Sequence, residues 1–219
     1  MTSRVAVWLG CAPPVRSLRW LDGAVAAGAT LGAATVVAAG VPTWLDLAAD
    51  RASRVGLAST GVATELRLDY LGWAQVMAAV ARQLEATTIL VDEASRPERV
   101  FEVAAIAELL EAAQLTHVVA FEPPTDGIVQ ASRIAGSELQ TCRVRGTAVL
   151  GVRIARAAIE AHATPPASVA MRRCDLAALG LDPVVLGHRA LPARAPHQPP
   201  TVERVADQLA AHVITRGVA

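Results

Sequence analysis

Short apolar runs rich in β-branched residues recur along the first part of the chain. They read RVAVWL, ATVVAA, RVGLAS, TTILVD and THVVAF, at residues 4–9, 34–39, 54–59, 87–92 and 116–121. Runs of this length and composition predict strands that are buried on both faces of a sheet. Segments with helical periodicity separate most of these runs. The alternation predicts an α/β fold with a parallel sheet and helices on both of its faces.

The helix predicted over residues 97–114 shows this periodicity most clearly. Its apolar stripe consists of Val100, Val103, Ala104, Ala107, Leu110 and Ala113. Glu102, Glu108 and Glu111 lie largely off that stripe. The pattern is typical of a helix that packs on a sheet with its apolar side.

The rhythm stops after Phe121, at the turn-rich sequence EPPTDG. Apolar and polar residues then alternate around Gly136-Ser137, at Ile134, Leu139, Thr141, Arg143 and Arg145. This pattern predicts a strand, a tight turn and a returning strand. A further strand, TAVLGVR, follows at residues 147–153. We therefore expect residues 122–153 to form an antiparallel extension of the sheet.

The last part of the chain has a different composition. The stretch LPARAPHQPP, beginning at Leu191, holds four prolines and must be extended. Thr201 is a plausible N-cap for a helix that runs to about Ile214. The sequence thus predicts one α/β domain over residues 1–190 and a proline-rich arm with a C-terminal helix over residues 191–219. Such an arm can be a surface appendage without a binding role, or it can wrap around another subunit.

Composition and charge narrow the function classes. The chain has 219 residues, 53% of them hydrophobic, which is enough for one sizeable core. Its 20 basic and 20 acidic residues balance and no basic stripe is present, so nucleic-acid binding is not expected. Every basic residue is arginine, so lysine chemistry is excluded. The uncharged run Gly23–Leu45 could cross a bilayer by length, but its Ala and Gly content and Pro42 favour a buried helix followed by a buried strand. We expect no membrane insertion and no signal peptide.

Cysteine and histidine usage gives no sign of a disulfide frame or a metal site. Cys11, Cys142 and Cys174 are odd in number and lack C-x-x-C spacing, which favours a reducing compartment and the cytoplasm. The five histidines include no ligand spacing, and His117, within LTHVVAF, is expected to be a satisfied core residue. We assign no metal.

The motifs of an autonomous enzyme are missing. The first strand is followed by LGCAPPV rather than G-x-G-x-x-G, the absence of lysine forbids a G-x-x-x-x-G-K-[ST] loop, and no G-x-S-x-G occurs. We assign no catalytic residue.

Any ligand is expected beyond the carboxyl ends of the parallel strands, where loops 9–14, 39–43 and 92–99 would line a nucleotide pocket. Ser95 and Arg96 precede Pro97 and a helix start, which favours an anion. The alternative is that Ser95 caps the helix while Arg96 and Arg99 are solvated.

The order of these parts resembles the β subunit of electron transfer flavoproteins. Four segments carry the resemblance, which spans nearly the whole chain by order and spacing: SRIAGSELQTCRVRGTAVLGVRI, PTWLDLAADRASRVGLAS, ATPPASVAMRR and LGLDPVVLGHRALPARAPHQPPTVERVADQLAAHV. The resemblance implies a doubly wound, mostly parallel sheet of the adenine nucleotide alpha-hydrolase kind. It also implies an antiparallel hairpin extension and a C-terminal arm, both of which clasp an α subunit.

The resemblance implies an electron-carrier function. In that family a heterodimer holds one FAD, mainly on the α subunit, and passes electrons from a dehydrogenase to a downstream acceptor. This chain would then do no bond chemistry and would shape the surroundings of the flavin. The residues at and after the end of the first strand that could approach the flavin are Trp8, Cys11 and Arg16.

The family also buries an AMP beside the loop after the fourth strand. The positions here that correspond to such a site or line it are Gly40, Asp92, Ser95, Arg96 and Phe101. Phe101 and Val103 stand where the family has Gln and Gly, and its Asp-Gly is missing, so the retention of AMP is open.

Docking to a dehydrogenase would involve Thr164, Pro165, Pro166 and Met171. Pro165 replaces the partner-anchoring leucine of the family, which suggests an unusual dehydrogenase or a loss of the usual docking. Composition and divergence favour a member of a specialised redox system, for instance one linked to the cofactor mycofactocin.

Two other function classes stay open. A nucleotide-binding module of the universal-stress-protein kind, without redox activity, shares the parallel core. That class should carry a G-x(2)-G-x(9)-G-[ST] loop, and HVVAFEPPTDGIVQAS holds only Gly127. The sequence is also compatible with a structural homodimer without a ligand.

Overall fold

The computed structural model describes residues 4–10, 28, 34–93, 99–153 and 170–187. Nine strands form one sheet in this part of the chain: β1 (Val5–Gly10), β2 (Ala34–Gly40), β3 (Ala58–Ala63), β4 (Thr88–Asp92), β5 (Ala113–Phe121), β6 (Ile128–Ala135), β7 (Glu138–Arg145), β8 (Ala148–Val152) and β9 (Arg172–Asp175). The helices are α2 (Pro42–Arg54), α3 (Tyr70–Gln83), α4 (Arg99–Leu110), the 3₁₀ turn η2 (Ala177–Leu179) and the short α5 (Pro183–Gly187).

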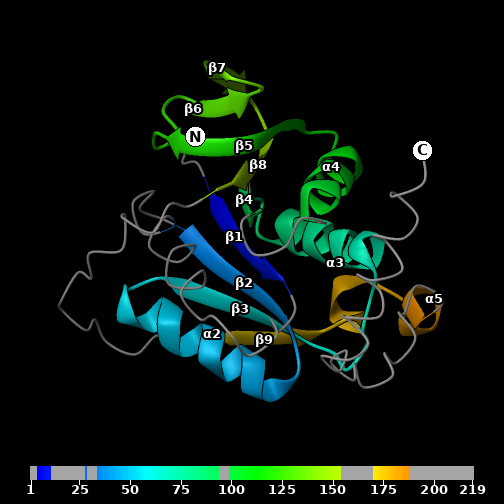
Figure 1. The fold of residues 1–219 in the computed structure, drawn as a ribbon. Helices are drawn as coiled ribbons and strands as arrows, with labels where there is room; N and C mark the ends of the chain where they lie inside the picture. The colour runs from blue at the N-terminus through cyan, green and yellow to red at the C-terminus, as the bar shows by residue number, and fades with distance from the viewer. Residues whose placement is uncertain (1–3, 11–27, 29–33, 94–98, 154–169, 188–219) are drawn as a thin grey trace, which may run out of the picture.

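The strand order is β7-β6-β5-β8-β4-β1-β2-β3-β9 (Figure 1). All neighbours from β5 to β9 in this order pair in parallel, and only the β5–β6 and β6–β7 pairs are antiparallel. Every residue of β1, β4 and β8 is buried, as expected for strands covered on both faces. The prediction of a doubly wound α/β fold with a mostly parallel sheet and an antiparallel extension is confirmed.

Two apolar clusters cover the two faces of the sheet. On one face, Trp44, Leu45, Ala48 and Ala52 of α2 pack against β1 and β2. On the other, α3 and α4 lie side by side and contribute Trp73, Met77, Val103 and Ile106, among others. Among the described residues, no helix is both long and apolar enough to cross a membrane.

The antiparallel extension is shorter than the sequence pattern predicted. β6 and β7 form the expected hairpin, with Ala135 opposite Glu138 and Gly136-Ser137 as the turn. Gly136 has φ +64°, which suits the first position of a two-residue hairpin turn. However, β8 does not continue the hairpin, because it pairs in parallel with both β4 and β5. The expectation that all of residues 122–153 are an antiparallel addition is therefore wrong for β8, which is a central core strand.

Two local expectations also need correction. The third strand begins at Ala58 rather than Arg54, because α2 continues to Arg54 and the chain turns at Gly56, where φ is +75°. In α4, Glu102 is buried although it lay off the predicted stripe, and Ala113, which lay on that stripe, is an exposed residue of β5. Arg99, buried beside Glu102, explains the first exception, because the two side chains form an ion pair within the protein.

Candidate functional site

The strand order reverses between β1 and β4, since β2 and β3 follow on one side of β1 while β4, β8 and β5 follow on the other. In sheets of this kind, ligands bind in the crevice outside the carboxyl ends of the strands at such a point. The residues that end the strands here are Gly10 of β1, Gly40 of β2 and Asp92 of β4. This edge of the sheet is therefore the candidate functional site.

Arg99, the first residue of α4, occupies the interior of this edge. Its Nη2 donates a hydrogen bond of 2.7 Å to the carbonyl oxygen of Leu9, and its Nη1 lies 3.5 Å from that of Trp8. A Cβ atom at Gly10, where φ is +72°, would lie only 1.9 Å from Arg99 Nη2. Gly10 thus allows the close approach of the guanidinium. Among the described residues of this edge, Arg99 carries a permanent positive charge directly beside the end of β1.

The charge of Arg99 is balanced by a carboxylate from its own helix. Arg99 Nε lies 3.6 Å from Glu102 Oε2, and both side chains are buried. An ion pair at i and i+3 brings the two groups to the same side of a helix. Opposite charges three residues apart at the start of a helix were visible in the sequence, but the alternative considered there, that Arg99 is solvated, is wrong.

The β2 side of the edge is closed by an indole ring. Trp44 Nε1 donates a hydrogen bond of 3.1 Å to the carbonyl oxygen of Gly10, and the same ring packs over Gly40, whose φ is +140°. A Cβ at Gly40 would lie 3.2 Å from Trp44 Cδ1. The two glycines therefore let a side chain from each neighbouring helix, Trp44 of α2 and Arg99 of α4, lie directly against the strand ends.

The structure does not bring all the predicted site residues together. Gly40 and Asp92 do lie at this edge, and Asp92 is buried. Trp8 is buried in the core, where its ring is tilted against Trp73 with centroids 6.4 Å apart, so it does not present a surface to a flavin. Phe101 is 60% exposed and lies against Tyr70, with ring centroids 5.9 Å apart. Lying outside the described residues are Cys11, Arg16, Ser95, Arg96, Thr164, Pro165 and Pro166.

Met171, predicted to contribute to partner docking, lies beside β9, the last strand at the lateral end of the sheet. It is half-buried and packs against the core cluster on the α2 face. A Cβ at Gly61 would lie 2.5 Å from its sulfur, so the thioether rests directly on β3. Met171 thus packs on its own sheet immediately before β9 begins.

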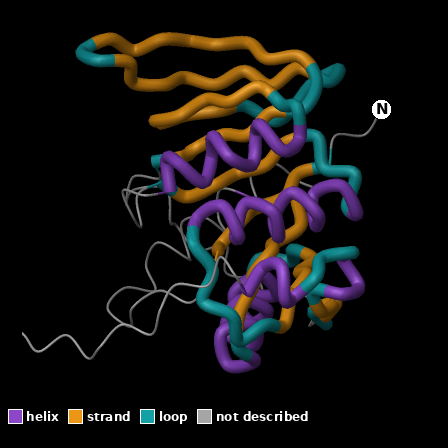
Figure 2. Tube along the Cα trace, turned by 90° about the vertical axis from the view of Figure 1, so that its right-hand side faces the viewer, coloured by secondary structure: helices purple, strands orange, loops and turns teal. Residues whose placement is uncertain are grey.

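The β6–β7 hairpin presents an open face. Figure 2 shows it extending beyond the helices at one end of the molecule. One face of the hairpin packs inward through Val129, Ala131 and neighbouring residues. The opposite face, here named the hairpin face, consists of the cross-strand pairs Ile128–Arg145, Gln130–Arg143, Ser132–Thr141 and Ile134–Leu139. Ile134 and Leu139 are cross-strand partners and are 42% and 69% exposed.

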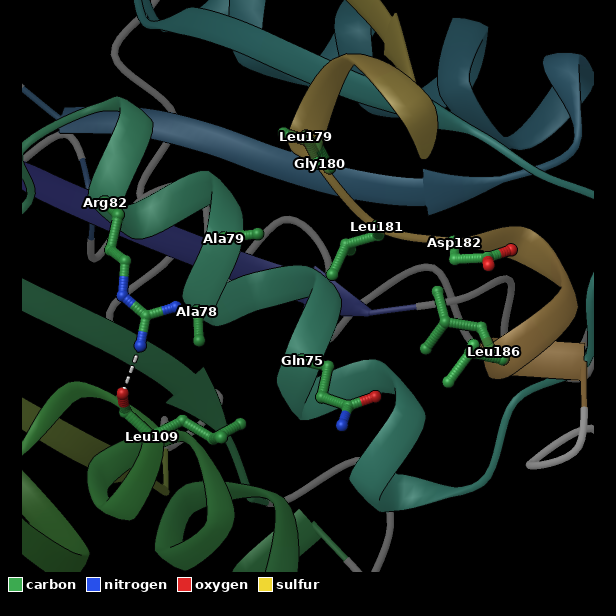
Figure 3. A pocket seen from close by; sticks show the side chains of 11 residues that line it. Gln75, Ala78, Ala79, Arg82, Leu109, Leu179, Gly180, Leu181, Asp182 and Leu186 are labelled. Carbon is green, nitrogen blue, oxygen red and sulfur yellow. Dashed lines mark hydrogen bonds between the residues drawn. The ribbon is translucent and has the colours of Figure 1, made fainter.

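A groove of about 430 Å³ lies away from the strand ends, between α3 and the segment η2–α5 (Figure 3). Its walls are largely aliphatic, with Gln75, Arg82 and Asp182 as the polar groups. Arg82 donates to the carbonyl oxygen of Leu109, and Asp182 Oδ1 accepts from the amide of Val184 at 2.8 Å. Because Arg82 and Asp182 already have partners within the chain and the other walls are largely aliphatic, we assign the groove no ligand.

Comparison with known proteins identified no relative of this chain. No family model matches the chain, and no curated protein matches it.

Proposed function

We propose that this chain is the β subunit of a heterodimeric electron transfer flavoprotein. It passes electrons from a dehydrogenase to a downstream acceptor through an FAD that is held mainly by the α subunit. Among the described residues, Trp8 is the one predicted to approach the flavin, and its burial does not fit such a contact. The proposal therefore gives this chain no step in the flavin chemistry. Its proposed role is that of a partner subunit in the cytoplasm.

The observation that supports the proposal is the hairpin face. Ile134 and Leu139 form an exposed apolar pair, and Arg143 and Arg145 extend the same side of β7. Apolar anchors with charged neighbours are typical of subunit interfaces, whose apolar centre is surrounded by a polar rim. The α subunit covers this face, and the two arginines pair with carboxylates on it.

The test is co-expression with an electron transfer flavoprotein α subunit from the organism that supplies the gene. With the affinity tag on this chain, we expect a yellow 1:1 complex whose absorbance spectrum is that of a flavin. Leu139→Asp should weaken the complex at least about tenfold, which corresponds to about 1.4 kcal/mol. The matched control is Val184→Asp, an equally exposed valine on α5, which should leave the complex intact.

Other outcomes would decide against the proposal. A stable monomer that captures no flavin-bearing partner contradicts it. A monomer that binds ATP or AMP without an α subunit would instead favour the nucleotide-binding module of the universal-stress-protein kind.

A further inference from the structure

Three ionisable side chains meet where β4 and β8 end, beside the middle of the neighbouring strand β5 and outside the switch point. Glu93 directly follows β4, Arg153 directly follows β8, and His117 lies within β5. β8 pairs with both β4 and β5, so the parallel sheet brings these three positions to the same edge. This group, here named the Glu93 cluster, is used neither by the candidate site at β1 nor by the hairpin face.

Glu93 is a buried carboxylate held in one position. Its side chain is 0% exposed, and its own amide donates a hydrogen bond of 3.0 Å to the carbonyl oxygen of Val152. Oε2 accepts a hydrogen bond of 2.9 Å from the backbone amide of His117 and lies 2.9 Å from Nδ1 of the same residue. A carboxylate this deeply buried is tolerated only with such partners.

The backbone is shaped to make this contact. His117 has φ +58°, a left-handed conformation that is uncommon for a residue with a side chain. It lies where β5 loses register with β8, between Leu115 and Val118. Gly151 completes the arrangement, because a Cβ there would lie 1.9 Å from Glu93 Oε1. Irregularities of this kind re-aim side chains beside functional sites.

These contacts fix the orientation of the His117 imidazole, which is partly exposed at the surface. Because Nδ1 contacts Glu93, Nε2 is directed away from the carboxylate, and the His117 side chain is 36% exposed. His117 was expected to be a satisfied core residue; its ring does have a partner, but its side chain is partly exposed. A histidine fixed by a carboxylate through one ring nitrogen presents the other nitrogen to a ligand or a proton.

Arg153 adds a permanent positive charge next to the imidazole. Its Nε lies 4.0 Å from Glu93 Oε2, and its side chain is 54% exposed. The guanidinium has a fork of donors that matches carboxylate and phosphate groups. Within the described residues no group of three metal-ligating side chains occurs, so the cluster does not form a metal site there.

We propose that His117 and Arg153 bind the carboxylate or phosphate group of a small molecule, with Glu93 as the positioning residue. Arg153 donates from its guanidinium, and His117 donates from Nε2 when both ring nitrogens hold a proton. Glu93 then accepts from Nδ1 and neutralises one of the two positive charges. With one carboxylate and two cations, the cluster is complementary to one further negative group. This inference does not depend on the proposed flavoprotein partnership.

The test is a titration followed on the histidine rings by NMR, on the full chain or on its complex. Histidine labelled with ¹⁵N and ¹³C gives one ring signal set for each of the five histidines. His117→Gln identifies the set of His117. Inorganic phosphate and acetate are added separately near pH 6.5, the ordinary pKa of histidine, with sodium chloride at equal ionic strength as the salt control. The phosphate and acetate arms distinguish the two anion types.

We expect a saturable shift of the His117 signals with at least one of the two anions and none with chloride. Arg153→Gln should weaken that binding at least about tenfold, as expected for loss of a charge-assisted contact. Arg54→Gln, a comparably exposed arginine that pairs with Asp50 on α2, is the matched control and should leave it unchanged. Glu93→Gln should change the Nδ1 and Nε2 shifts in the free protein, because a neutral amide replaces the carboxylate charge beside Nδ1.

Two results would overturn the inference. One is a His117 signal that moves no more with phosphate or acetate than with chloride. The other is equal binding by the parent chain and Arg153→Gln. Neither result is read on Glu93→Gln, so neither depends on whether that variant folds.

Discussion

Arg99 joins parts of the chain that are far apart in sequence. From the start of α4, its guanidinium reaches the carbonyl oxygen of Leu9 in β1, and its charge is balanced by Glu102 one helical turn later. Both side chains are buried, so their pairing offsets part of the cost of removing the two charges from water. Arg99 therefore links α4 to the end of β1 and stabilises the interior of the candidate site.

Removing this arginine should be strongly destabilising. Arg99→Ala leaves the Glu102 carboxylate buried without its cation and Leu9 without this donor, so the free energy of unfolding should fall by about 3–5 kcal/mol. Urea unfolding followed by circular dichroism measures the change. The double variant Arg99→Leu/Glu102→Leu should lose less than Arg99→Ala alone, because no isolated charge remains. A loss under about 1 kcal/mol for Arg99→Ala would contradict this account.

Cys174 offers a prediction about pH. Burial disfavours its thiolate and raises the thiol pKa, an effect that Arg172 opposes and Asp175 reinforces. At a given pH the folded chain therefore holds less thiolate at this position than the unfolded chain does. Because the thiolate is the reactive form, alkylation of native Cys174 should be slower and its pH profile should lie at higher pH. For the same reason, ionisation of this thiol in the unfolded chain should lower stability as pH rises through the unfolded thiol pKa.

The measurement uses a Cys11→Ala/Cys142→Ala chain, in which Cys174 is the remaining thiol. Iodoacetamide alkylation is followed by mass spectrometry in native buffer and in urea over a series of pH values. Equal rates in the two conditions at every pH would show that burial has no effect on this thiol.

At the scale of the elements, the sequence predicted what depends on local patterns. Strands buried on both faces, such as β1 and β4, are continuous apolar runs, and the β6–β7 hairpin alternates around its glycine turn. The parallel pairing of β8 was missed because the neighbours of a strand are set by distant segments, here β4 and β5. Glu102 was placed off the buried side of α4 for a related reason. Its partner Arg99 makes burial possible, and helical periodicity counts only apolar residues.

The start of α3 depends on one side chain. Asp69 is the N-cap, and its Oδ1 accepts a hydrogen bond of 2.7 Å from the amide of Gly72. Asp69→Ala leaves that amide without its acceptor and should lower the free energy of unfolding by about 0.5–2 kcal/mol. Urea unfolding is again the measurement. Asp50→Ala removes only an exposed pair with Arg54 and should change stability by about 0.5 kcal/mol or less, so equal losses would contradict the capping role.

At the scale of the whole molecule, the sequence located the candidate site but not its interior. The loops after β1, β2 and β4 could be placed at one edge because parallel strands end together. The Arg99 contact with β1 and the Glu93 contact with His117 could not be predicted, since each joins residues that only the sheet brings together. In both cases a glycine makes the room, Gly10 for the first and Gly151 for the second.

The topology also predicts which part of residues 122–153 can be removed. The amide of Gly146 donates a hydrogen bond of 3.0 Å to the carbonyl oxygen of Gly127, so the two ends of the hairpin segment are adjacent. Deleting residues 128–145 and joining Gly127 to Gly146 through one added glycine removes β6 and β7 without touching β8. This chain should fold with a native-like far-ultraviolet circular dichroism spectrum. It should be less stable than the parent, because β5 loses its pairing with β6 and the core loses the buried side chains of Val129 and Ala131.

Deleting all of residues 122–153 should have a different effect, because it also removes β8 from between β4 and β5. β8 is buried along its whole length, and its loss exposes the edges of two core strands, so this chain should fail to fold and should aggregate. Circular dichroism and size-exclusion chromatography compare the two deletions. If the folded 128–145 deletion no longer captures the α subunit, the hairpin face is the docking surface. A 122–153 deletion that folds as well as the 128–145 deletion would mean that β8 is not required for the core.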